Sequence, residues 1–377
     1  MIYFDNAATT LPKSKGALRA YKKAFQSCGN ASRGGHPFAA RASEHLYLCR
    51  ERLAERFGTE PERVVLTMNA THAINLAVKG LIREGDVLIS DLEHNAVYRP
   101  LYALEKQGRI RIRVFHADLD DDEATVRRFR AALDENVRAC VVTHASNICG
   151  RVLPLAALSE AARQAGVPLI CDASQTAGHF DLQLRELPGV TALCMPGHKG
   201  LYGPLGTGAL LVSPFFGGSF ETLLEGGSGS FSADPEMPAL LPERLEAGTM
   251  NAPAFAGLAA AVAEKSASGK KEEQIFSYLL SGLRETEGVT LYGAPGAAGL
   301  PYCPILLFNI DGRDSEEVAA ALADTDVCVR AGLHCSPLAH RALGTPLGGA
   351  VRISLSKHNT FGEAERFLAI LARQKAR

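Results

Sequence analysis

The sequence predicts an α/β protein in which a large domain, built on a doubly wound and mainly parallel β-sheet, precedes a smaller α+β domain. Two observations predict this fold class. From about residue 60 to residue 212, short apolar runs alternate with segments of helical periodicity, as in sheets whose two faces are covered by helices. After a Gly/Ser-rich stretch at 225–244 the alternation stops, and a shorter set of strands and helices follows.

The first region predicts a series of strands separated by helices of ordinary length. Ligands of such sheets bind beyond the carboxyl ends of the strands, so polar residues at those ends are the candidate site. The predicted strands are 63–67, 86–90, 111–117, 139–145, 168–174, 192–196 and 209–212. The predicted helices are 70–82, 97–107, 122–134 and 154–165.

The second region predicts the smaller domain. A helix rich in small residues is expected at 253–265 and would bridge the two domains. Beyond it we expect strands at 305–310, 328–332 and 351–355, a helix at 315–322 and a final helix from 362. The predicted division is an N-terminal segment at 1–15 that packs with the small domain, a large domain at 16–250 and a small domain at 251–377.

Composition limits the classes of function. The chain has 40 Lys and Arg against 41 Asp and Glu, a balance that argues against general electrostatic binding of nucleic acid or an anionic membrane. Neither a secretory signal nor a long apolar span is present, so we expect a cytoplasmic protein without a membrane partner. The nine cysteines are scattered without a Cys-x-x-Cys pair, which predicts free thiols and no metal site.

The glycine-rich stretch 195–212 places His198 and Lys199 side by side in a turn before an apolar strand. Gly and Pro cluster in ordinary loops, so one interpretation is a lysine that faces water. The other is that the glycines clear space for a bulky ligand that bonds to Lys199. The glycines are Gly197, Gly200, Gly203, Gly206 and Gly208.

Other polar residues recur where apolar runs end. Ala70 and Thr71 open a helix, whose free N–H groups and hydroxyl suit a phosphate, although an ordinary helix start needs no ligand. His94 follows the next run and either stacks on a planar cofactor or is a loop histidine. Asp172 ends a buried run, where a carboxylate is costly unless a cation meets it.

One ligand, pyridoxal phosphate, explains these groups together. Asp172 would pair with the protonated pyridine nitrogen, and Lys199 would form a Schiff base with the aldehyde. Thr71 and His198 would hold the phosphate, and His94 would stack on the ring. Each element alone is weak, and their convergence carries the inference.

The chain resembles the class V aminotransferase superfamily and, within it, the cysteine desulfurases and selenocysteine lyases. This resemblance implies the pyridoxal-phosphate-dependent transferase fold of type I, and it runs nearly end to end. The segments that carry it are 4–10, 30–33 with His36, 69–71, 93–95, 146–147, 172–175, 197–199, 246–251, 330–335 and 352–355.

The resemblance implies a role for single residues. Lys199 would be the imine lysine and proton shuttle, and Gln175 would donate to the phenolic oxygen of the ring. Asn147 and Arg352 would clamp the substrate carboxylate, which a planar guanidinium meets with two hydrogen bonds. Thr249 would reach the phosphate of a neighbouring subunit, which implies a homodimer with shared active sites.

Together these arguments give a set of predicted site residues, with no metal ligand among them. The predicted catalytic residues are Lys199, Cys335 and His94. The predicted cofactor-binding residues are Ala70, Thr71, His94, Asn147, Asp172, Gln175, His198, Lys199 and Thr249. The predicted substrate-binding residues are Asn147, Arg352, His36 and Arg330.

Cys335 differs from the other cysteines because it lies in a turn and not in an apolar run. One alternative is another inert free thiol. Against this, His334 and Arg330 lie close in sequence and would favour the thiolate, which is the nucleophilic form. The resemblance places Cys335 where cysteine desulfurases keep the residue that takes the substrate's sulfur as a persulfide.

Some positions depart from the family pattern. Pro196 stands where many relatives have a hydroxyl that binds phosphate, and His72 stands where relatives often have Glu. The loop between Cys335 and Arg352 is short and rich in Gly and Pro, as in desulfurases with an ordered cysteine loop. The unusual segment 226–238 is expected to border the site.

The leading hypothesis is a pyridoxal-phosphate-dependent desulfurase that converts L-cysteine to L-alanine, with an acceptor protein for the sulfur. The alternatives are a selenocysteine lyase, a cysteine-sulfinate desulfinase, another lyase or aminotransferase of the class, and a degenerate fold that only binds. Intact Lys199, Asp172 and Arg352 argue against the last of these.

Overall fold

The computed structural model describes residues 1–31, 34–230, 232–264, 269–296 and 299–373. The strands are β1 Ile2–Tyr3, β2 Val64–Thr67, β3 Gly85–Ser90, β4 Ile110–Phe115, β5 Val137–Thr143, β6 Leu169–Asp172, β7 Val190–Pro196, β8 Gly208–Val212, β9 Val289–Tyr292, β10 Ile305–Ile310, β11 Val327–Cys328 and β12 Val351–Ser354. The helices are α1 Lys15–Ser27, α2 Pro37–Phe57, α3 Ala70–Leu81, α4 Asn95–Lys106, α5 Asp122–Ala132, α6 Leu155–Ala165, α7 Ala252–Ala263, α8 Lys270–Glu285, α9 Ser315–Ala323, α10 Pro337–Ala342 and α11 Phe361–Arg373.

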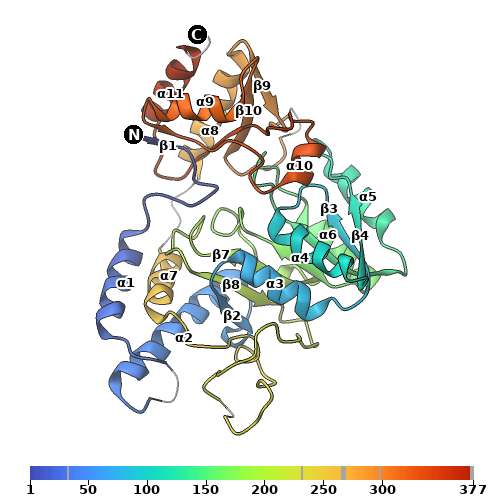
Figure 1. The fold of residues 1–377 in the computed structure, drawn as a ribbon, viewed down its shortest axis with the longest axis vertical. Helices are drawn as coiled ribbons and strands as arrows, with labels where there is room; N and C mark the ends of the chain where they lie inside the picture. Colours follow the sequence, from blue (N-terminus) through green and yellow to red (C-terminus); the bar gives the residue numbers. More distant parts are fainter. Residues whose placement is uncertain (32–33, 231, 265–268, 297–298, 374–377) are drawn as a thin grey trace.

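The larger sheet has seven strands in the order β2-β8-β7-β6-β5-β3-β4. Its strands β7, β6, β5, β3 and β4 pair in parallel, and β8 is antiparallel to both β2 and β7. The predicted α/β class with a mainly parallel sheet is therefore confirmed (Figure 1). The carboxyl ends of the parallel strands meet at one edge, where sheets of this kind bind their ligands.

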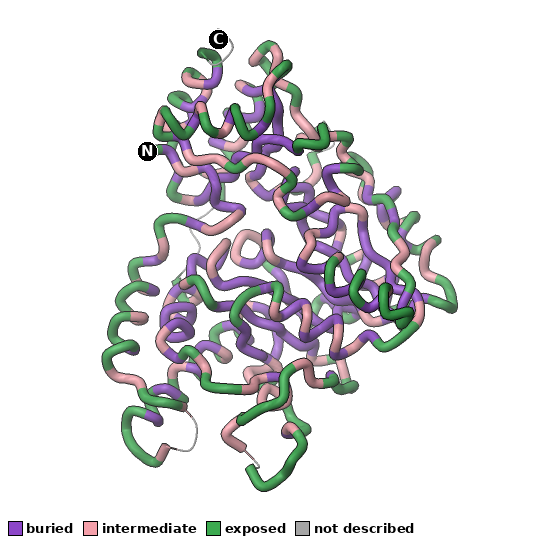
Figure 2. Tube along the Cα trace, in the orientation of Figure 1, coloured by how far each residue is buried: buried purple, intermediate pink, exposed green. Residues whose placement is uncertain are grey.

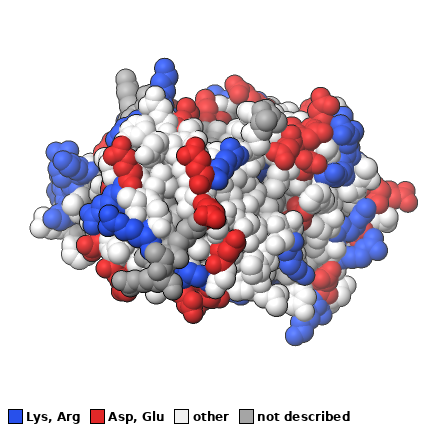
Figure 3. Space-filling model, turned by 90° about the horizontal axis from the view of Figure 1, so that it is seen from above, with Lys and Arg blue, Asp and Glu red and all other residues white. Residues whose placement is uncertain are grey.

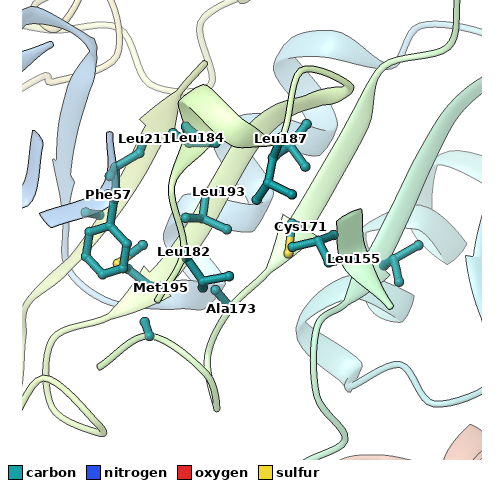
Figure 4. Packing of buried hydrophobic residues seen from close by; sticks show 14 of the residues in the cluster. Phe57, Leu155, Cys171, Ala173, Leu182, Leu184, Leu187, Leu193, Met195 and Leu211 are labelled. Atoms are coloured by element: carbon teal, nitrogen blue, oxygen red, sulfur yellow. The ribbon is translucent and has the colours of Figure 1, made fainter. Parts of the chain in front are cut away.

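Helices cover both faces of this sheet, because successive strand residues point to opposite sides. On one face, Cys171 and Leu193 pack against α2 and α6 (Figure 4). On the other face, their neighbours Ile170 and Ala192 pack against α3 and α4. Each large apolar side chain buried in this way stabilises the fold by about 1.5–3 kcal/mol.

The rest of the chain forms a second, smaller packed unit. The strands β12, β10 and β9 form an antiparallel sheet, and β1 pairs in parallel with β11. Phe4 from the N-terminal segment packs edge-on against Phe367 of α11, with 5.5 Å between ring centroids. The start and the end of the chain thus share one apolar cluster.

The predicted division of the chain into three parts stays a prediction. One predicted boundary lies just before α7, so the packing of this helix bears on where that boundary would lie. This helix contacts α1 and α2 beside the large sheet. The predicted helix 253–265 corresponds to α7, and its predicted last residue, Lys265, lies outside the described residues.

The predicted strand 328–332 is wrong beyond Cys328. The pairing of β11 with β1 ends at Cys328, Arg330 then makes an isolated bridge to Arg352, and the chain bends at Gly332. Gly332, His334 and Cys335 all have positive φ, which a strand does not allow. A tight loop that carries Cys335 replaces the end of the strand.

The surface is mixed in charge and the interior is apolar. Figure 2 shows the strands of the sheet buried, whereas residues 225–230 and 232–244 are mainly exposed or half-buried and project from the lower edge of the molecule. On the face in Figure 3, acidic and basic side chains are interspersed. Among the helices of the described ranges, none is both long and apolar enough for a membrane span.

Candidate active site

Lys199 lies in the turn between β7 and β8, at the carboxyl edge of the large sheet. Glycines shape this turn for a reason other than the predicted one. A Cβ on Gly197 would collide with Thr207, and a Cβ on Gly200 would collide with the carbonyl oxygen of Ala177. The idea that these glycines clear space for a ligand is wrong at these two positions, because protein atoms fill that space. They allow the backbone of the turn to pack closely.

A cavity of about 100 Å³ opens beside Lys199 at this edge. The ends of β5, β6 and β7 and the first turns of α3 and α4 form its wall. The structure therefore brings together most of the residues that the sequence predicts as cofactor ligands. They are Ala70, Thr71, His94, Asn147, Asp172, Gln175, His198 and Lys199.

Lys199 and Asp172 both line the cavity, and the carboxylate of Asp172 affects the pKa of Lys199. Burial lowers the pKa of Lys199 to about 8, and the Asp172 carboxylate opposes this shift. A neutral, nucleophilic amine is therefore accessible near neutral pH. Within the described residues, Lys199 Nζ makes no hydrogen bond. The Oδ1 atom of Asp172 accepts two hydrogen bonds, one from the backbone N–H and one from the hydroxyl of Ser174. Its Oδ2 atom therefore stays available to a ligand.

His94 is held as a neutral ring by the helix that it begins. Its Nδ1 accepts the backbone N–H of Ala96 at 2.9 Å, so the ring proton lies on Nε2. Burial lowers the pKa of His94 to about 4, with Asp172 opposing the shift. A neutral aromatic ring at this place suits stacking on a planar cofactor.

The first turn of α3 offers a seat for an anion. Asn69 caps the helix through His72, whereas the N–H groups of Ala70 and Thr71 have no acceptor in the described part of the chain. Burial lowers the pKa of His198 to about 4, so this neutral ring would contribute as a hydrogen-bond donor. Pro196 lines the same cavity and adds no donor.

Gln175 closes the cavity on the side of the N-terminal segment. Its amide nitrogen donates to the carbonyl oxygen of Ala7 at 3.2 Å. An amide nitrogen carries two protons, so one remains for a ligand. This bond also joins the N-terminal segment to the carboxyl end of the large sheet.

Arg352 and Arg330 share the carboxylate of Asp5, a residue for which the sequence predicts no role. Arg352 Nη2 lies 3.0 Å from Asp5 Oδ1, and Arg330 contacts both oxygens of Asp5 at 2.8–3.1 Å. Arg352 is nearly fully buried, and its Nε has no partner among the described residues. Asp5 lies inside the N-terminal motif, but no spacing rule connects residue 5 with residue 352.

Asn147 links Arg352 to the loop of Cys335. Its backbone carbonyl accepts a hydrogen bond from Arg352 Nη1 at 2.9 Å. Its side chain donates to the carbonyl oxygen of His334 at 3.0 Å and accepts the hydroxyl of Ser336 at 2.6 Å. Asn147 therefore fixes the cysteine loop while it borders the cavity.

Cys335 is the exposed member of the nine free cysteines. Its backbone has φ +56°, and its carbonyl oxygen accepts the N–H of Asn95, the residue after His94. The thiol is thus presented from a strained loop beside the cavity that holds Lys199. Strained backbone of this kind clusters at functional sites.

One part of the predicted environment of Cys335 is wrong. Burial lowers the pKa of His334 to about 2, and the Arg352 cation acts in the same direction. His334 is therefore neutral at physiological pH and adds no positive charge for a thiolate. Arg330, which interacts electrostatically with Cys335, is the flanking cation that remains.

Two predicted residues lie away from the Lys199 cavity of their own chain. His36 is exposed and caps α2, with its Nδ1 accepting the N–H of Ala39. Thr249 lines a separate cavity of about 390 Å³ with the half-buried Arg50–Glu246 ion pair. Residues 227–229 line that second cavity too, and no described residue of the segment 226–238 lines the cavity beside Lys199. Ser32 and Arg33 lie outside the described residues.

Comparison with known proteins identifies the family. The family model described as aminotransferase class-V matches residues 2–367. The chain belongs to the aminotransferase class-V family. A "Probable cysteine desulfurase" of Methanothermobacter thermautotrophicus is 32% identical over 97% of this chain and 92% of its own. Another, from Xylella fastidiosa, is 31% identical over 98% and 90%.

A solved structure agrees with the class-V assignment. The apo structure of a cysteine desulfurase from Thermococcus onnurineus superposes with a TM-score of 0.88, at 28% identity, over 99% of this chain and 94% of that one. The chain therefore has the type I fold of pyridoxal-phosphate enzymes, and pyridoxal phosphate is its cofactor. The donor set fits, since a free Asp172 oxygen, a free Lys199 amine and a helix start meet in one cavity.

Proposed function

We propose that this class-V enzyme is a cysteine desulfurase, which converts L-cysteine to L-alanine and takes the sulfur on Cys335. The observation that carries the proposal is the position of Cys335 at the rim of the Lys199 cavity. Its carbonyl oxygen accepts a hydrogen bond from the backbone N–H of Asn95, the residue after His94. Transamination alone leaves this strained, exposed thiol without a role. The full-length desulfurase relatives support the same reading.

Different residues of the cavity would bind different parts of the cofactor. Lys199 would hold the aldehyde of the cofactor, Asp172 would accept the pyridinium N–H, and the start of α3 would hold the phosphate. Bound pyridoxal phosphate supplies an electron sink for the substrate's Cα. His94 excludes water from the ring face, and Lys199 moves a proton to and from the substrate carbon.

Cys335 carries the sulfur step. Its Sγ attacks the substrate sulfur, a sulfur–sulfur bond forms, and the Cβ–S bond breaks with its electron pair left on the carbon. A proton on that carbon completes alanine, and the enzyme retains one sulfur as a persulfide. Arg330 stabilises the attacking thiolate, and an acceptor protein with a thiol would then remove the sulfur.

The experiment compares two cysteine variants. The purified enzyme should be yellow and should form alanine from L-cysteine. Cys335→Ala should abolish alanine formation and keep the colour, whereas Cys328→Ala, at a half-buried cysteine near the same loop, should change neither. Turnover of cysteine by Cys335→Ala at the wild-type rate would refute the sulfur step.

We also propose a homodimer in which Thr249 serves the neighbouring active site. It is supported by the position of Thr249 in a cavity separate from the one beside Lys199. Mixing Lys199→Ala with Thr249→Ala subunits would then create one intact site for each mixed dimer. Recovery of activity on mixing is expected. A monomeric protein, or no recovery after subunit exchange, would contradict the shared site.

A further inference from the structure

Asp5 is shared by two arginines at the edge of the active site. Arg330 approaches it from the exposed side, with about half of its side chain in solvent, and Arg352 approaches it from the buried side. Four hydrogen bonds of 2.8–3.1 Å join the three residues. The group carries two positive charges and one negative charge, so its net charge is one positive unit.

The group acts on the reacting centre. Burial is the largest cause of the lowered pKa of Lys199, and after Asp172, which opposes it, Arg352 and Arg330 lower this pKa further while Asp5 raises it. Asn147, on the wall of the Lys199 cavity, bonds directly to Arg352. A substrate held at Lys199 therefore experiences the net charge of the three residues together and not that of Arg352 alone.

We propose that Asp5 determines which amino acids this site accepts. Its negative charge leaves the group of three residues with one net positive charge, which a single substrate carboxylate neutralises. This inference rests on the proposed function, in which Arg352 binds the carboxylate of an amino acid. An amino acid with one acidic group, such as cysteine, leaves the site neutral. One with a second acidic group, such as cysteine sulfinate, leaves an unbalanced negative charge and is disfavoured.

The fold holds Asp5 independently of its carboxylate. The carbonyl oxygen of Phe4 accepts the N–H of Ser354 at 2.7 Å, and the N–H of Ala7 donates to the Ser354 hydroxyl at 2.8 Å. The backbone on both sides of Asp5 is therefore bonded to β12. Replacing the carboxylate with an amide changes the charge at the same place in the fold.

The test measures binding, and so does not depend on the sulfur chemistry. L-Aspartate, with two carboxylates, and L-alanine, with one, are titrated against the yellow holoenzyme by the change in its visible absorbance. Asp5→Asn should favour aspartate over alanine by about tenfold more than the wild type does. Asp5→Glu, which restores the charge, should keep the wild-type ratio of dissociation constants.

Asp86 provides a matched control. It too is buried and shared by two arginines, Arg111 and Arg113, but it lies at the amino end of β3, opposite the active-site edge. Asp86→Asn should leave the aspartate-to-alanine ratio unchanged. A ratio that does not move in Asp5→Asn, or moves equally in Asp86→Asn, would overturn the proposal.

Turnover gives a second readout. In a sulfinate substrate the Cβ–S bond breaks with its electron pair left on carbon, which takes a proton, and sulfur dioxide leaves to be hydrated to sulfite. Asp5→Asn should raise the ratio of kcat/KM for cysteine sulfinate over cysteine. If the wild type did not release sulfur from cysteine, the proposed function would be refuted. The role of Asp5 would still be tested, because the ratio of the dissociation constants for aspartate and alanine does not depend on turnover.

Discussion

The carbonyl oxygen of Cys335 accepts a hydrogen bond from the backbone N–H of Asn95, with 2.7 Å between the two atoms. Asn95 is the first residue of α4, and its neighbour His94 lines the Lys199 cavity. A helix start has N–H groups without partners inside the helix, so the cysteine loop satisfies one of them. The position of the Cys335 loop is thereby coupled to the start of α4 and to His94, the residue that would stack on the cofactor ring.

The cysteine loop depends on a close backbone contact between Gly349 and Gly332. A Cβ at Gly349 would collide with the carbonyl of Gly332, at a backbone φ of +78°. Gly349→Ala should therefore displace the loop, lower alanine formation about tenfold or more, and leave the yellow colour. Gly344→Ala is the control, because it has a similar φ of +67° and open space around it. Equal losses in both variants would contradict the contact.

His94 has two separable roles, as a helix cap and as a ring. Asn at this position also caps helices, so His94→Asn should stay within about 0.5 kcal/mol of the wild-type free energy of unfolding but bind the cofactor more weakly. His94→Phe should keep the ring and lose about 1 kcal/mol from the missing cap. Urea unfolding and cofactor titration measure the two effects. A large stability loss in His94→Asn would argue against the cap.

Glu93 predicts a pH dependence of stability. Its carboxyl is fully buried, accepts the N–H of Thr143 at 2.8 Å, and leaves Oε2 without a partner among the described residues. Burial raises the pKa of Glu93 from 4.5 to about 8, with the Asp172 charge adding to the effect. Between these values the folded state binds one proton more than the unfolded state, so this residue makes stability fall as pH rises.

Glu93→Gln keeps the shape of the protonated acid and removes this titration. Relative to the wild type, the variant should gain stability between pH 5 and pH 8, by a few kcal/mol at most. Urea unfolding at the two pH values measures the difference. Parallel pH profiles for the two proteins would show that Glu93 does not hold a proton in the fold.

His334 should not activate Cys335 by charge. Because its pKa is about 2, His334→Gln should change the rate of alkylation of Cys335 at pH 7 by less than about twofold. Arg330→Gln should slow alkylation more, since it removes the neighbouring cation. Mass spectrometry of the alkylated peptide gives both rates. A slower reaction in His334→Gln than in Arg330→Gln would reverse this assignment.

The sequence predicted what depends on local pattern. The apolar runs that became β5, β6 and β7 are buried strands, and the rule that ligands bind at strand ends placed Asp172 and Lys199 in one cavity. The antiparallel β8, inserted between β2 and β7, was not evident, because an apolar run has no direction.

Contacts between residues far apart in the sequence could not be predicted, and neither could the ionisation states of buried groups. The Asp5–Arg352 pair joins the segment after β1 to the last strand, β12, and no periodicity of the sequence indicates it. His334 looks like a cation in the sequence, but burial beside Arg352 makes it neutral. The glycines near Lys199 suggested an open space, and only the packing of Gly197 against Thr207 shows that the turn itself needs them.

The most direct test of the account locates the sulfur that leaves the substrate. The holoenzyme is incubated with L-cysteine without an acceptor, digested, and mapped by mass spectrometry. One additional sulfur atom on the peptide that contains Cys335, absent in Lys199→Ala protein treated in the same way, is the predicted result. Alanine formed with no sulfur on Cys335, or sulfur spread equally over Cys28 and Cys328, would contradict the account.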